Sequence, residues 1–166
     1  WSPQETILAS TGNDSTIRLW NQAGSLTKVL EGHTGPIYSL AWNHDGTILA
    51  SSGKDGTIRF WDQDGSLIKV LVVDRDSIYS LAWNHDGTIL ASAGAHGTIR
   101  LWDQDGILIK VLEGHRGSIY SLAWNHYGTI LAADGFKGTI RIWEIADLPA
   151  SLEEMLMLLK EARKSL

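Results

Sequence analysis

The feature that most constrains the fold of this 166-residue chain is the even spacing of its tryptophans. One series consists of Trp1, Trp42, Trp83 and Trp124, and the other of Trp20, Trp61, Trp102 and Trp143. Both series have a period of 41 residues, and residues 42–82 and 83–123 are identical at 32 of 41 positions. A period of this length predicts stacked repeat units, each of which buries its apolar faces against its neighbours.

Each repeat unit has the pattern of a four-stranded sheet. Short runs rich in β-branched and aromatic residues occupy 88–92, 98–102, 108–112 and 118–124. Turn sequences with Asp and Gly separate them, as at 84–87 and 103–106, which is the usual boundary of a strand. Four short strands in about 40–45 residues are typical of a propeller blade.

Two dipeptides make the pattern more specific. Gly32–His33 and Gly114–His115 precede a predicted inner strand, and Trp61–Asp62 and Trp102–Asp103 end a predicted third strand. Together with the segment 49–62, which ends at Trp61–Asp62, these dipeptides make the unit resemble the repeat of the WD-repeat β-propeller family. The resemblance covers about residues 1–145 and implies an all-β fold of four WD-type blades in residues 1–146.

Two of these blades are expected to be complete and two partial. The first lacks its innermost strand, because Trp1 aligns with the end of that strand in later copies, and the last has three strands. Propellers close with four to eight blades, and the resemblance implies seven or eight. Open faces and unpaired edges are a liability. We therefore expect half of a ring, completed either by a homodimer of about eight blades or by further blades of a longer protein.

The last segment, residues 147–166, has a different pattern. Ser151 and Glu154 form a capping box after Pro149, and an apolar stripe follows at helical spacing. We expect a short amphipathic α-helix that packs on the propeller or covers an exposed edge; the alternative is that it docks a partner or another subunit.

The family resemblance also implies a buried hydrogen-bonded chain of His, Ser or Thr, Asp and Trp in each blade. In the second blade these residues are His33, Ser51, Asp55 and Trp61. Such a network is strong in a low-dielectric interior when it is complete, and costly when it is broken. The same residue types form nucleophilic triads, but the chain has no Gly-x-Ser-x-Gly elbow. We therefore expect no catalytic residues here.

The other blades depart from this pattern. The third has Asp74 at the histidine position and His96 at the aspartate position, with Ser92 and Trp102, so Asp74 and His96 are expected to rebuild the pair with exchanged roles. The fourth keeps His115 and Trp143 but has Ala133 and Lys137, which predicts a broken network and a solvent-facing lysine. The first keeps Ser10, Asp14 and Trp20 without a histidine in this chain.

A partner-binding rim is predicted from the same resemblance. Residues just inside the first strand map to Tyr38, Tyr79 and Tyr120, and residues before the conserved aspartate include Lys54 and Phe136. Three tyrosines in register would give an aromatic ring near the channel mouth, and tyrosine is enriched at binding hot spots. The alternative is that they fill the space between blades.

Composition excludes several classes of function. The net charge of −5 argues against nucleic acid and membrane surfaces, which need a basic field. The chain has no cysteine, which excludes thiolate metal sites and suits a cytoplasmic location. His44, His85 and His126 recur in turns that we expect to lie far apart, so no metal or cofactor is predicted.

The sequence therefore predicts a non-enzymatic protein-interaction scaffold. The position before the conserved aspartate differs between otherwise similar blades, as Lys54 and Phe136 show. Two alternatives remain. One is a structural unit whose only activity is assembly, with engineered or recently amplified repeats. The other is a lectin-like propeller that binds a sugar in each blade.

Overall fold

The computed structural model describes residues 1–73 and 76–145, which form four small antiparallel sheets. Blade 1 contains β1 (Ile7–Thr11), β2 (Ile17–Asn21) and β3 (Leu26–Leu30). Blade 2 contains β4 (Ile37–Trp42), β5 (Leu49–Gly53), β6 (Thr57–Trp61) and β7 (Leu67–Val72). Blade 3 contains β8 (Ile78–Trp83), β9 (Ile89–Gly94), β10 (Ile99–Asp103) and β11 (Leu108–Leu112). Blade 4 contains β12 (Ile119–Trp124), β13 (Ile130–Gly135), the 3₁₀ turn η1 (Phe136–Gly138) and β14 (Thr139–Glu144).

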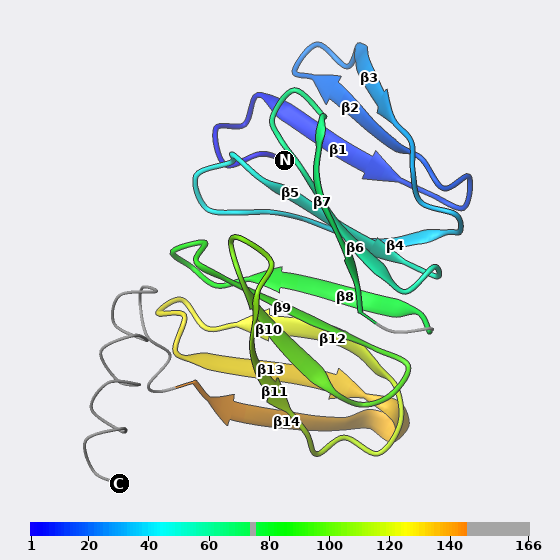
Figure 1. Cartoon of the computed structure of the whole chain (residues 1–166). Coiled ribbons are helices and arrows are strands. Elements are labelled where there is room, and N and C mark those ends of the chain that lie inside the picture. The colour runs from blue at the N-terminus through cyan, green and yellow to red at the C-terminus, as the bar shows by residue number, and fades with distance from the viewer. Residues whose placement is uncertain (74–75, 146–166) are drawn as a thin grey trace, which may run out of the picture.

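The strands of each sheet follow one another in chain order as a meander, and the four sheets succeed one another along the molecule (Figure 1). This confirms the predicted all-β fold of two four-stranded and two three-stranded blades. The predicted C-terminal helix, residues 147–166, lies outside the described residues.

The recurring turn after each inner strand is set by side-chain hydrogen bonds. In blade 2 the Asn43 side chain accepts from the Ile48 N–H at 2.9 Å, and the Asp45 carboxylate accepts from the Thr47 hydroxyl at 2.6 Å. Gly46 has φ of +69°, a conformation that favours glycine. These contacts recur one repeat later, so the Asn-His-Asp-Gly sequence is explained by the hairpin it closes.

Successive blades pack face to face, so blades 2 and 3 are covered on both sides. The cluster between blades 3 and 4 joins Ile99 and Leu101 of one sheet to Leu131 of the next. Equivalent clusters join blades 1 and 2 and blades 2 and 3. Sheets buried on both faces have no polar side of their own, and each blade therefore depends on its neighbours for burial of its apolar residues.

Hydrogen bonds between inner strands reinforce this packing at a constant separation of 42 residues. The Trp83 indole N–H donates to Ala41 O at 3.2 Å, and that of Trp124 donates to Ala82 O at 3.0 Å. The Leu81 N–H likewise donates to the Ser39 hydroxyl at 3.0 Å. The buried indole N–H of Trp42 has no partner, because the equivalent carbonyl would stand one residue before Trp1.

The described residues include no helix long and apolar enough to cross a membrane.

Removal of a side chain from between two blades tests this packing. Leu101 is 0% exposed, so Leu101→Ala is expected to lower the free energy of unfolding by about 2–5 kcal/mol through the cavity it leaves. Urea denaturation followed by tryptophan fluorescence measures the change. The control is Val72→Ala, at a side chain that is 83% exposed, for which a change within about 0.5 kcal/mol is expected. Equal costs for the two variants would contradict the described packing.

Candidate functional site

The three rim tyrosines each occupy an irregularity at the start of an inner strand. The strand register shifts between Ile37 and Ser39, which leaves Tyr38 without a paired residue on β5. The same shift occurs around Tyr79 in β8 and Tyr120 in β12. A β-bulge of this kind turns a side chain away from the regular alternation. The sequence alone did not indicate these bulges.

The bulges bring the three phenol rings into one row. The ring centroids of Tyr38 and Tyr79 are 5.5 Å apart, and those of Tyr79 and Tyr120 are 5.8 Å apart. These separations lie in the range of favourable tilted aromatic pairs. The outer two residues, Tyr38 and Tyr120, are 44% and 52% exposed, so each packs on Tyr79 and also presents a surface to solvent. We call Tyr38, Tyr79 and Tyr120 the tyrosine row.

Lys54 and Phe136 flank this row at its two ends. The Lys54 N–H donates to Pro36 O, and the Phe136 N–H donates to Ser118 O, both at 2.8 Å. Lys54 is thus held next to Pro36, two residues before Tyr38, and Phe136 is held next to Ser118, two residues before Tyr120. Lys54 is exposed, and Phe136 is 49% exposed. One end of the row therefore presents the Lys54 ammonium, and the other presents the Phe136 ring with the Lys137 ammonium 5.7 Å from its centroid.

The close approach of two backbones at this rim requires glycine. A Cβ on Gly53 would lie 2.2 Å from Pro36 O, and one on Gly94 would lie 2.0 Å from Ser77 O. No side chain fits at these distances, so Gly53 and Gly94, which end the second strands of blades 2 and 3, allow the bulged inner strands to approach.

Blade 2 contains the complete hydrogen-bonded network. The Trp61 indole N–H donates to the Ser51 hydroxyl at 2.9 Å, which lies 2.8 Å from His33 Nε2. His33 Nδ1 lies 2.8 Å from the Asp55 carboxylate. The partners fix the tautomer: Nδ1 carries the proton, and Nε2 accepts from the hydroxyl. Ser51 is 0% exposed, so its hydroxyl has no access to a substrate and acts as a structural group.

The pKa shifts agree with this proton arrangement. Burial lowers the pKa of His33 and outweighs the opposing effect of Asp55. Burial alone would raise the pKa of Asp55, but hydrogen bonds from the Thr34 N–H, the Thr57 hydroxyl and His33 together hold it below its usual range. At neutral pH the pair is therefore a neutral imidazole against a carboxylate.

Blades 1 and 3 retain the tryptophan–serine part of the network. The Trp20 indole donates to Ser10, and the Trp102 indole donates to Ser92, each at 2.8 Å. In blade 1 the Asp14 carboxylate pairs with Arg18 at 2.7 Å. The hydrogen bond from Arg18 lowers the pKa of Asp14 most, and hydrogen bonds from Thr16 lower it further.

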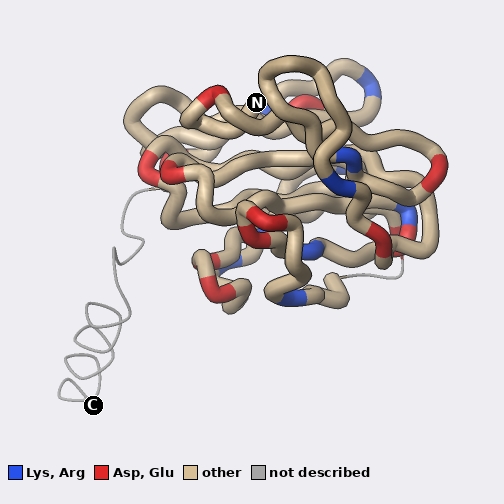
Figure 2. Tube along the Cα trace, turned by 90° about the horizontal axis from the view of Figure 1, so that it is seen from above, with Lys and Arg blue, Asp and Glu red and all other residues tan. Residues whose placement is uncertain are grey.

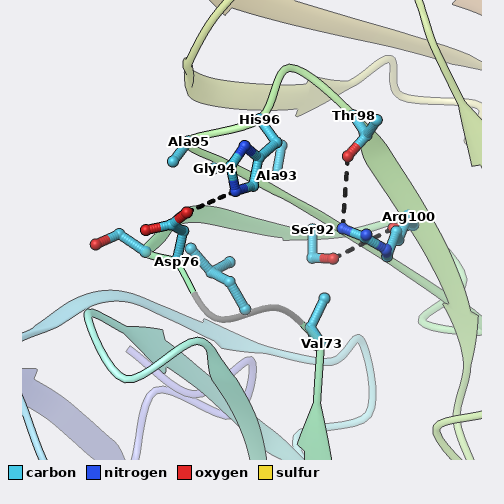
Figure 3. A pocket seen from close by; sticks show the side chains of 11 residues that line it. Val73, Asp76, Ser92, Ala93, Gly94, Ala95, His96, Thr98 and Arg100 are labelled. Carbon is cyan, nitrogen blue, oxygen red and sulfur yellow. Dashed lines mark hydrogen bonds and ion pairs between the residues drawn. The ribbon is translucent and has the colours of Figure 1, made fainter.

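In blade 3, His96 pairs with Asp76, two residues after the predicted partner Asp74. His96 Nε2 lies 2.6 Å from the Asp76 carboxylate, and both side chains are more than half exposed. Figure 3 shows this pair at the mouth of a small cavity that Ser92 and Arg100 also line. Asp74 lies outside the described residues, so its pairing with His96 stays a prediction.

Blade 4 has an incomplete network. The buried Nε2 of His115 has no hydrogen-bond partner, because Ala133 stands where blade 2 has Ser51. The His115 ring lies 5.7 Å from that of Trp143. Lys137 is exposed and adopts φ of +67°, and its ammonium lies 5.7 Å from the Phe136 ring centroid.

The turn histidines are close together, and the expectation that they lie far apart was wrong. The ring centroids of His44 and His85 are 5.3 Å apart, and those of His85 and His126 are 4.4 Å apart. Equivalent turns of successive blades therefore meet. Among the described residues, no group of three or more His, Cys, Asp or Glu side chains is arranged to hold a metal ion.

Four stacked meander sheets with a repeated buried Trp–Ser contact define a propeller-type repeat protein. The comparison with known families is specific: the profile described as "WD domain, G-beta repeat" matches residues 1–21, 24–62, 65–103 and 106–144. The chain belongs to the WD-repeat family, as the resemblance predicted.

Individual relatives match over a single repeat. The F-box-like/WD repeat-containing protein TBL1X of Mus musculus and of Homo sapiens is 40% identical over 43 residues. The F-box-like/WD repeat-containing protein TBL1Y of Homo sapiens has the same identity over the same length. The match spans 26% of this chain and 8% of the length of each relative.

Completion of the network in blade 4 should stabilise it. Ala133→Ser places a hydroxyl where His115 Nε2 lacks a partner, and about 1 kcal/mol of added stability is expected. Chemical denaturation measures the gain. The control is Ala50→Ser, which puts a hydroxyl into the apolar cluster around Ile58 and should destabilise the chain. A loss of stability from Ala133→Ser would contradict the assignment.

The His33–Asp55 pair predicts a stability that falls with acid. The unfolded chain protonates His33 at a higher pH than the folded chain does, so stability falls as pH drops below about 6.5. Asp55 acts in the same direction at lower pH, since its pKa is depressed in the folded state. The thermal midpoint of His33→Gln should depend less on pH between about 7 and 5 than that of the unmodified chain. An unchanged pH dependence in His33→Gln would contradict the assignment of the acid sensitivity to His33.

Proposed function

We propose that the chain is a non-enzymatic scaffold that binds a protein or peptide partner along the tyrosine row. The single observation that carries this proposal is the contact of Tyr38, Tyr79 and Tyr120 across three successive blades. WD-repeat proteins are generally protein-interaction scaffolds, which supports the general class but not the particular surface.

The row has the physical properties of a binding surface. Tyrosine offers a large rigid ring and a hydroxyl at small cost in side-chain entropy. The rings support one another, so they are already ordered before a partner arrives, and preordering reduces the cost of binding. A partner that follows the row would meet Lys54 at one end and Phe136 at the other, which gives it a direction.

Charge supports a protein partner over a nucleic acid. The chain carries 14 Lys and Arg residues against 19 Asp and Glu residues. Figure 2 shows the basic residues scattered over separate segments rather than gathered on one face. Binding to phosphates depends on a concentrated basic surface, so neither nucleic acid nor an anionic membrane is part of the proposal.

Self-association is the second part of the proposal. Two copies would form a homodimer that completes a ring of about eight blades, and further blades of a longer protein would serve the same end. The alternative is a unit whose only activity is assembly. It includes the same self-association, but no partner binds to the tyrosine row.

The test of the tyrosine row uses a displayed peptide library and a glycan array on the same immobilised chain. Peptides that bind the unmodified chain are expected to lose at least about 30-fold in affinity on Tyr38→Ala/Tyr79→Ala/Tyr120→Ala, which corresponds to about 2 kcal/mol at a hot spot.

The matched control for that test is Tyr127→Ala. Tyr127 is 81% exposed and follows the opposite end of β12, so peptide affinity should be unchanged. Equal losses for the two variants would contradict the proposed surface. Binding to glycans alone would favour the lectin-like alternative, and the absence of any ligand would favour assembly alone.

A further inference from the structure

The far side of blade 4 exposes apolar residues whose repeat equivalents are buried. Ile140 and Ile142 are 71% and 67% exposed. Their equivalents are 0–3% exposed in every earlier blade: Ile17 and Leu19, Ile58 and Phe60, Ile99 and Leu101. The repeat thus provides an internal comparison, in which the same position on the third strand is covered three times and uncovered once. The side formed by Ile140, Ile142 and Ala132 also carries the exposed Asp134, which is directly paired with Ile140. We call this side the trailing face.

Within the chain, the same two kinds of residue cover this position each time. A leucine from the second strand of the next blade and a tryptophan from its third strand pack in the contact between blades. They are Leu49 and Trp61, then Leu90 and Trp102, then Leu131 and Trp143. The surface that fits the trailing face is therefore one that presents a leucine and a tryptophan side by side on two paired strands.

Blade 1 presents that pair on its own uncovered side. Leu8 and Trp20 stand at the equivalent positions and are directly paired across β1 and β2. The Trp20 ring is held in place by its hydrogen bond to Ser10. Ile7 and Ala9, which alternate with these residues, pack toward blade 2 instead. We call the side formed by Leu8, Ser10 and Trp20 the leading face. It lies at the opposite end of the stack from the trailing face (Figure 1).

We propose that the trailing face of one copy docks on the leading face of a second copy, head to tail. This inference rests on the self-association part of the proposed function and names its surfaces. The two faces differ, so the contact is heterologous, and two such contacts close a ring of two copies if the rotation allows it. Two trailing faces would bring isoleucines together without the leucine–tryptophan pair that covers them elsewhere.

The first test is the mass of the chain in solution. Sedimentation and native mass measurement should give twice the chain mass of 18.3 kDa. The Ile140→Glu/Ile142→Glu variant should be a monomer that keeps the far-ultraviolet circular dichroism spectrum of the unmodified chain, since both side chains are exposed in the single chain. The control Ile68→Glu/Val72→Glu adds the same charge at residues that are 54% and 83% exposed on β7, and it should remain a dimer.

The second test distinguishes the head-to-tail arrangement from pairing of like faces. Leu8→Glu should also give monomers, whereas pairing of two trailing faces would leave its dimer intact. An equimolar mixture of Leu8→Glu with Ile140→Glu/Ile142→Glu should recover a dimer, because one unmodified trailing face still meets one unmodified leading face. A dimeric Leu8→Glu variant, or a mixture that stays monomeric, would overturn the proposal.

The third test asks what covers the trailing face. The chain has no cysteine, so Ile140→Cys introduces a single thiol that a maleimide can report. Labelling should slow as protein concentration rises through the dimerisation range. Labelling that is slow at every concentration would show a cover from within the same chain, and labelling that is fast throughout would show no cover. Either result would overturn the proposal. Retained peptide binding by the monomeric variants would show that the tyrosine row functions independently.

Discussion

The stacking of one sheet on the next is the interaction on which the rest of this structure depends. Each sheet is apolar on both faces, so a single blade has no stable side to turn to water. Ile99 and Leu101 are fully buried only because blade 4 follows them. The same contact brings the three rim tyrosines within reach of one another, and it leaves Ile140 and Ile142 exposed where the stack ends. Stability, the candidate binding surface and the proposed assembly all follow from one repeated contact.

The buried polar network divides into a constant part and a variable part. The tryptophan–serine hydrogen bond occurs in blades 1, 2 and 3 with lengths of 2.8–2.9 Å. The indole ring also covers the preceding blade, so its N–H must find an acceptor inside the protein. The acid–base pair beside it changes from blade to blade, and in blade 2 it is buried, with side-chain exposures of 1% for His33 and 6% for Asp55. His96 shows this difference, since it pairs with Asp76 at a half-exposed position.

The sequence predicted the fold well because the signal was repeated. The tryptophan period and the turn residues indicated the blades and the strands, and the family resemblance implied the network of blade 2. The bulges at Tyr38, Tyr79 and Tyr120 could not be predicted, because they depend on the register between two strands and not on the residues of either. The contacts of His44, His85 and His126 were missed for a related reason. Sequence spacing of 41 residues carries no information on how close equivalent turns lie after the sheets stack.

The constant separation of 42 residues between hydrogen-bonded inner strands has a consequence for folding speed. Equivalent contacts in successive blades close loops of the same length, as the bonds from Trp83 and Trp124 do. The entropy lost in closure is therefore the same for each added blade. A longer chain of these repeats therefore gains contacts without gaining sequence separation, and its relative contact order falls as it grows. Folding rate tracks relative contact order in small proteins. By this measure, an array of such blades should fold faster than all-β proteins in which strands distant in sequence pair.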